Sequence, residues 1–222
     1  MLSALPHYAE LRCCSNFSFL RGASHPEELV ARAHALGYTA LALTDECSMA
    51  GVVRAHVAAK SHGLKLLVGS QFRVQAEAPF TLVLLAVNAQ GYGNLCEFIT
   101  RLRRSAPKGS YRLDWARIDS AALADCLAIA VPSPQATQAQ TDALARWLLR
   151  HFVGCCWLGV EHRRELDDEL RLQQSRQSSE LTAVPLVAVG DVQMHLRSRQ
   201  PLHDVLTATR LRRPLAECGR EL

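Results

Sequence analysis

Short runs of consecutive apolar residues dominate the chain, and they alternate with segments in which apolar residues recur every three or four positions. The runs occupy residues 39–44, 64–68, 80–87, 126–131, 155–160 and 185–189. A strand that is apolar throughout is buried on both faces, which is typical of a parallel sheet covered by helices. Roughly six or seven such units favour a barrel over an open sheet. We therefore predict an α/β barrel with parallel strands inside and helices outside.

The segments between these runs predict amphipathic helices. The first helix would begin at a capping box formed by Ser24 and Glu27, with Pro26 in its first turn. The second, over residues 49–61, would turn an apolar stripe toward the core, formed by Met49, Val52, Val53 and Val57. Further helices are expected over residues 91–104, 137–151, 167–181 and 201–211, and a long loop over residues 108–120.

The length and the cysteines indicate a single large domain in a reducing compartment. A chain of 222 residues that is 49% apolar can bury one sizeable core. Residues 1–8 lack the features of a signal peptide, and no apolar stretch reaches the roughly 18 residues of a membrane span. None of the eight cysteines forms a Cys-x-x-Cys pair, so we interpret them as reduced and mostly buried. We expect a cytoplasmic protein with no membrane partner.

Polar residues follow several of the predicted strands, and in a parallel barrel such positions converge on one pocket. Arg12 and Cys14 would face the same side of the first strand, and later strands are followed by Asp45, Glu46, Gln71, Asp191 and Gln193. The acids could bind a hard cation, or they could cap the helices that follow them. Two arginines in the same pocket, Arg12 and Arg21, argue against a cation, because like charges at about 4 Å repel by several kcal/mol.

The formal net charge of +4 is modest, but the cations are clustered. One cluster contains Arg101, Arg103, Arg104 and Lys108, and the other contains Arg197, Arg199, Arg210, Arg212 and Arg213. Clusters of this kind are usually solvated faces, and contact with a phosphate backbone is the sharper alternative. The candidate phosphate contacts are Arg101, Arg103, Arg104, Arg197 and Arg199.

Six segments resemble, in order, the motifs of one family. They are residues 12–24 (RCCSNFSFLRGAS), 42–51 (ALTDECSMAG), 68–72 (VGSQF), 84–95 (LLAVNAQGYGNL), 108–112 (KGSYR) and 190–195 (GDVQMH). Together they resemble the PHP (polymerase and histidinol phosphatase) domain that opens bacterial C-family DNA polymerases of the DNA polymerase III alpha type, most closely the error-prone, ImuC-like branch. The resemblance implies a distorted (β/α)7 barrel similar to a TIM barrel. It also implies a PHP domain over residues 1–200 and, over residues 201–222, the start of the connection toward a polymerase palm.

Where the family's PHP pocket is intact, it holds three metal ions on nine side chains and can remove 3′ nucleotides. By position, two family histidines correspond to Arg12 and Cys14, and an aspartate corresponds to Arg21. A histidine, a glutamate, a histidine and a cysteine correspond, in that order, to Glu46, Gln71, Thr81 and Val131. In the last Asp-x-His pair Asp191 remains, while the histidine is replaced by Gln193. The resemblance thus implies a vestigial pocket, which also contains Asp45, with one of nine ligands retained.

We therefore expect a degenerate, metal-free structural or interaction module without exonuclease activity and without a cofactor, in which Arg12 and Arg21 pair with the acids. The alternative is a metal-dependent phosphoesterase or 3′–5′ exonuclease with rearranged ligands, drawn from Cys14, Asp45, Glu46, Asp191 and His195. The parent polymerase would be a nucleotidyltransferase. This chain has no Asp-x-Asp pair for the two Mg²⁺ ions of such an enzyme, and the resemblance places the palm acids outside it.

The resemblance also implies partners and a cellular role. The partners would be the remainder of the polymerase chain, DNA, the sliding clamp and accessory proteins similar to ImuA and ImuB. The role would lie in damage-induced (SOS) mutagenesis and translesion synthesis, as part of DNA repair and replication.

Overall fold

The computed structural model describes residues 7–219. Most of residues 1–8, where a signal peptide was sought, and the chain end at Leu222 lie outside the described residues. The chain divides into two compact units, which are described separately. The first consists of residues 1–67 and 191–222, and the second consists of residues 68–190.

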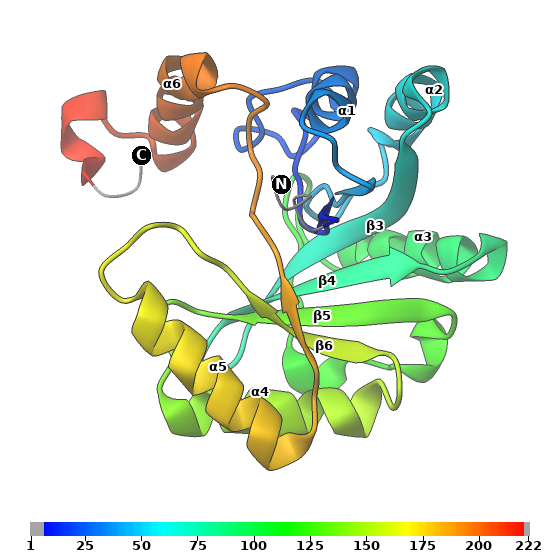
Figure 1. Ribbon diagram of the computed structural model, residues 1–222, viewed down its shortest axis with the longest axis vertical. Coiled ribbons are helices and arrows are strands. Elements are labelled where there is room, and N and C mark those ends of the chain that lie inside the picture. The colour runs from blue at the N-terminus through cyan, green and yellow to red at the C-terminus, as the bar shows by residue number, and fades with distance from the viewer. Residues whose placement is uncertain (1–6, 220–222) are drawn as a thin grey trace, which may run out of the picture. The chain divides into compact units, whose positions relative to one another are not determined.

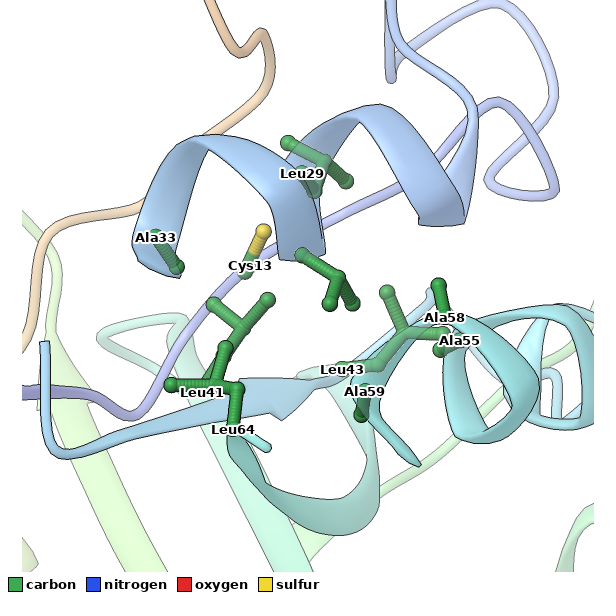
Figure 2. Packing of buried hydrophobic residues seen from close by; sticks show 10 residues of the cluster. Cys13, Leu29, Ala33, Leu41, Leu43, Ala55, Ala58, Ala59 and Leu64 are labelled. Carbon is green, nitrogen blue, oxygen red and sulfur yellow. The ribbon is translucent and has the colours of Figure 1, made fainter. Parts of the chain in front are cut away.

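The first unit is built from short parallel strands, three α-helices and the two short helices η3 (Arg197–Arg199) and η4 (Leu215–Glu217). The strands are β1 (Ala9–Glu10), β2 (Ala40–Leu43) and the beginning of β3 (Lys65–Val74); the helices are α1 (Pro26–Ala35), α2 (Val52–His62) and α6 (Gln200–Leu211). β1 and β2 are parallel, with Ala9 opposite Ala40. Figure 2 shows α1 lying over β2 with α2 beside them, and the buried side chains filling the space between. This small core fixes the strand ends that carry the charged residues.

Two details of the predicted helices in this unit are wrong. The N-cap of α1 is His25, whose backbone N–H donates to Glu28 Oε2 at 2.8 Å, so Ser24 does not cap the helix. The apolar stripe of α2 is also misplaced, because Val53 is 71% exposed and Val57 is 65% exposed. The buried side chains of this helix are alanines, at positions 55, 58 and 59. Small side chains at the contact allow α2 to approach its neighbours closely.

The second unit contains the rest of the sheet, in the order β3-β4-β5-β6-β7. Its further strands are β4 (Phe80–Ala86), β5 (Cys126–Pro132), β6 (Cys156–Val160) and β7 (Leu186–Ala188). Its α-helices are α3 (Ala89–Arg104), α4 (Gln138–His151) and α5 (Asp168–Thr182), and it has two short helices, η1 (Trp115–Arg117) and η2 (Ala121–Leu123). Figure 1 shows α5, in yellow, alongside α4, and the two helices pack against β5 and β6. α3 contacts β4, α4 contacts β5 and β6, and α5 contacts β6 and β7.

The prediction that all strands run parallel is wrong for β4. This strand is antiparallel to both β3 and β5, whereas β5, β6 and β7 are mutually parallel. Only residues 75–79 connect β3 to β4, and a parallel crossover needs about a dozen residues or more. The second reversal returns β5 to the direction of β3. Among residues 7–219, no helix combines the length and the apolarity needed to cross a bilayer.

Candidate functional site

The strand ends of the first unit hold a buried ion pair between Arg12 and Asp191. The backbone brings the two segments together, because Cys13 forms a parallel bridge with Val192, and the Val192 N–H donates to the Arg12 carbonyl at 3.0 Å. The Arg12 Nη2 atom lies 3.1 Å from Asp191 Oδ1, and each side chain is only 11% exposed. A guanidinium within hydrogen-bond distance of a carboxylate satisfies both charges in a place where water has limited access.

Asp191 is further connected to helix α6 through a relay of side chains. Gln193 Nε2 donates to Asp191 Oδ2 at 3.2 Å, and Gln193 Oε1 lies 2.6 Å from Nε2 of His203. Since the amide oxygen only accepts, the imidazole must carry its proton on Nε2. Burial is the largest cause of the lowered pKa of His203; the charge of Asp204 opposes this shift, the charge of Arg210 adds to it, and the charge of Asp191 opposes it. His203 is therefore held as a neutral donor at the end of this relay.

A second ion pair, between Arg21 and Glu46, lies in the same unit. Both side chains are mostly buried, with exposed fractions of 22% and 14%. The turn that presents Arg21 also holds Glu46, because Ser18 Oγ accepts from the Glu46 backbone N–H at 2.8 Å. This turn requires glycine at position 22, where a Cβ atom would lie 2.0 Å from the Ser15 carbonyl oxygen. The local sequence thus fixes the cation and the acid together.

Asp45 is buried, and hydroxyl and amide donors hold its carboxylate. The Ser15 N–H and the Ser18 hydroxyl donate to Oδ1, each at 2.7 Å, and the Ser15 hydroxyl donates to Oδ2 at 2.8 Å. Burial raises the pKa of Asp45 even though these hydrogen bonds oppose the shift. Cys14 lies nearby, and burial followed by the charges of Asp191 and Asp45 raises the pKa of its thiol to about 12. Cys14 is thus held as a neutral thiol.

These residues do not fit a divalent cation. The carboxylate oxygens of Asp45 already accept three hydrogen bonds, and Asp191 and Glu46 are each paired with a guanidinium. A cation would compete for the same lone pairs, and each unit charge about 4 Å from an arginine would be repelled by about 4 kcal/mol at an effective dielectric constant of about 20. Within residues 7–219, no three His, Cys, Asp or Glu side chains are grouped as metal ligands would be.

His195, the alternative nitrogen ligand, is engaged elsewhere in the first unit. Its Nδ1 atom lies 2.7 Å from Ser24 Oγ, and its backbone N–H donates to the same hydroxyl at 2.9 Å. The ring is also 3.8 Å from a carboxylate oxygen of Glu28. These contacts tie the segment after Asp191 to the start of α1.

In the second unit the predicted pocket positions are neutral. Gln71 lies on β3 opposite Val83 and is 5% exposed. Thr81 and Val131 are direct partners in the antiparallel register of β4 and β5. Thr81 and Val131 thus lie opposite each other across the sheet, and the side chains of Gln71, Thr81 and Val131 carry no formal charge.

The arginines predicted to contact phosphate differ in the residues that they already contact within the protein. Arg199 pairs with Glu28 at 2.6 Å, which ties η3 to α1, whereas Arg197 is exposed. On α3, Arg101 pairs with Glu97, and the guanidinium of Arg103 lies 5.5 Å from the ring centroid of Tyr111. Arg199 is thus part of the fold, while the end of α3 remains a cationic surface.

Sequence reasoning missed three residues that hold the site. Ser15 and Ser18 bind Asp45, and their spacing of three within a polar turn is the signal that could have identified them as a carboxylate cradle. His203 had no such signal, because it lies in a predicted helix ten residues after the glutamine that it contacts.

Comparisons with known proteins agree with this α/β arrangement. A protein from Bifidobacterium adolescentis, assigned as a metal-dependent phosphoesterase, superposes with a TM-score of 0.65 at 15% identity, covering 85% of this chain and 88% of its own. An amidohydrolase from Chromobacterium violaceum, solved with sulfate and no metal, gives a TM-score of 0.64 at 15% identity, with coverages of 84% and 87%. These likenesses confirm the predicted fold class, a PHP-type α/β barrel similar to a TIM barrel, apart from the reversed strand.

Sequence comparisons then identify the family. The family model described as PHP domain matches residues 10–150, and the chain belongs to the PHP domain family. The error-prone DNA polymerase of Methylococcus capsulatus is 54% identical over 98% of this chain, and that of Ralstonia nicotianae is 53% identical over 97%. The chain spans about a fifth of the length of these relatives, 20% and 21% respectively. The predicted resemblance is confirmed.

Proposed function

We propose that this chain is the PHP domain of an error-prone DNA polymerase in which ion pairs within the protein have replaced metal ions. In this proposal the domain is a non-catalytic structural module and has no exonuclease activity. The observation that carries the proposal is the buried pair between Arg12 and Asp191, since Asp191 is the acid retained from the family's ligand set.

The charge balance of the first unit supports the proposal. Arg12 and Arg21 provide two positive charges, and their partners Asp191 and Glu46 provide two negative charges. Two further acids of this unit, Asp45 and Glu10, are buried. Burial raises the pKa of Asp45, which weakens its tendency to carry a charge. Glu10 accepts from the Tyr8 hydroxyl at 2.9 Å and from the Arg12 backbone N–H at 2.8 Å. Acids that already have hydrogen-bond or ion-pair partners offer a divalent cation less attraction, and binding of such an ion by Asp191 or Glu46 would require displacement of a guanidinium.

The test is elemental analysis of the tag-free chain after it is saturated with Zn²⁺, Mn²⁺ or Fe²⁺ and dialysed. We expect only traces of metal and no release of 3′ nucleotides from a labelled primer in the presence of Mn²⁺. The Asp191→Asn variant is the matched control, because any ion held in this pocket would be lost with the acid. Stoichiometric metal that disappears in this variant, together with 3′ nucleotide release, would establish the phosphoesterase alternative instead.

The relatives extend the proposal to the parent protein. It would act in translesion synthesis during damage-induced mutagenesis, in the cytoplasm, with the palm acids and their Mg²⁺ in another part of the polymerase chain. Its partners would include DNA, the sliding clamp and accessory proteins similar to ImuA and ImuB. Co-purification of these proteins with the full-length polymerase after DNA damage tests this wider role.

A further inference from the structure

The C-terminal end of α3 and the loop that follows it form a cationic surface in the second unit. We define the α3 basic surface by four exposed cations, namely Arg101, Arg104, Lys108 and Arg112. Residues 97–112 contain these four and Arg103, against a single acid, Glu97. The negative end of the helix dipole is offset here by the three arginines of the last turn.

Specific contacts hold the loop, so its cations are presented in a fixed arrangement. The hydroxyl of Tyr111 accepts from the Arg73 backbone N–H at 2.7 Å, and its ring packs against Phe72 with the centroids 6.3 Å apart. Next to it, Arg112 Nε donates to the side chain of Gln75 at 2.9 Å, and the Gln75 N–H donates to the Leu113 carbonyl at 2.7 Å. The loop is thus fastened to the end of β3.

Among residues 7–219, three of these cations form no ion pair with an acid, and Arg112 is one of them because its partner is the amide of Gln75. Within residues 7–219, neither Arg104 nor Lys108 forms an ion pair, and both are exposed. Arg101 is 63% exposed and remains in contact with solvent despite its pair with Glu97. Exposed cations contribute little to folding stability, and of the four only Arg112 takes part in the contacts that hold the loop.

We propose that the α3 basic surface binds the phosphate backbone of DNA without reading its bases. Arginine and lysine side chains that neutralise phosphates release counterions, which gives affinity independent of sequence. The guanidinium of Arg103 lies over the ring of Tyr111, the aromatic residue of this surface, and so covers a face that a base could otherwise stack on. The choice of DNA over an acidic protein rests on the proposed function, whereas the site itself depends only on the second unit.

The experiment measures fluorescence anisotropy of the chain with a labelled DNA oligonucleotide, single-stranded or duplex, at salt concentrations from about 50 to 200 mM. The test variant is Arg104→Ala with Lys108→Ala. The matched control is Arg146→Ala with Arg150→Ala, which removes two exposed arginines from α4, also near a helix end. Circular dichroism verifies that both variants keep the fold.

We expect the test variant to bind about tenfold more weakly at low salt, and the slope of log affinity against log salt to become less steep by about two. The control variant should bind as the parent does. Equal loss in both variants, or no loss in the test variant, would overturn the proposal. Equally effective competition by poly-glutamate would assign the surface to an acidic polypeptide instead. None of these results depends on metal content, so failure here is distinguishable from failure of the proposed function.

Discussion

The two units differ in the side chains that occupy the predicted pocket positions. In the first unit these positions keep their charges, and each buried ion pair joins segments that are distant in sequence, such as Arg12 with Asp191. In the second unit the corresponding positions are Gln71, Thr81 and Val131, which carry no charge. Removal of one partner from a buried ion pair leaves an unpaired charge inside the fold, whereas substitution of a neutral residue leaves no such charge. The first unit should therefore be far more sensitive to single substitutions.

The largest effect is expected from Arg12→Ala. Removal of the guanidinium leaves Asp191 buried without its cation, and we expect the free energy of unfolding to fall by about 3 to 5 kcal/mol. Urea unfolding followed by circular dichroism measures the loss. The double variant Arg12→Ala with Asp191→Asn should recover part of this loss, because it no longer buries an unpaired carboxylate. An unchanged urea midpoint in Arg12→Ala would contradict the expectation that the first unit is more sensitive to substitution than the second.

A smaller effect is expected from Val131→Ala in the second unit. The valine is 5% exposed, and its truncation leaves a small cavity that should cost about 1 to 3 kcal/mol. Its partner across the sheet provides the control, since Thr81→Val keeps the volume and should change stability by less than about 1 kcal/mol. A loss in Thr81→Val as large as that in Arg12→Ala would show that the second unit also depends on polar contacts.

The smallest effect concerns pH. Burial lowers the pKa of His203 in the folded chain. At pH values between this lowered pKa and the unfolded pKa near 6.5, the unfolded chain therefore binds more protons than the folded chain. The stability from this residue should therefore be present above about pH 6.5 and be lost as the pH falls below it. The difference in urea midpoint between the parent and His203→Gln, measured from about pH 5.5 to 7.5, isolates this contribution. A difference that stays constant over this range would contradict the assignment.

Sequence reasoning predicted the order of strands and helices well, because continuous apolar runs and helical periodicity report burial directly. It also predicted that Arg12 and Arg21 pair with acids, and the structure contains both ion pairs. It did not predict the direction of β4, since an apolar run has no polarity of its own and the connection over residues 75–79 contains no glycine or asparagine to mark a hairpin.

Side-chain partners were harder to predict than backbone elements. Val53 and Val57 of α2 fitted a helical stripe but face solvent, because alanines on another side of the helix permit closer packing. Ser24 fitted a capping box but binds His195, and this contact joins residues 171 positions apart, which no local pattern reports. The ion pair between Arg12 and Asp191 likewise depends on a backbone bridge that forms only in the folded chain.

The reversal of β4 changes where a side chain must be sought along the chain. A strand that runs against its neighbours delivers its first residues, rather than its last, to the edge where the neighbouring strands finish, and this is why Thr81 near the beginning of β4 meets Val131 near the finish of β5. A search of related sequences for side chains at that edge should therefore inspect the residues that open this one apolar run, and the residues that close the others.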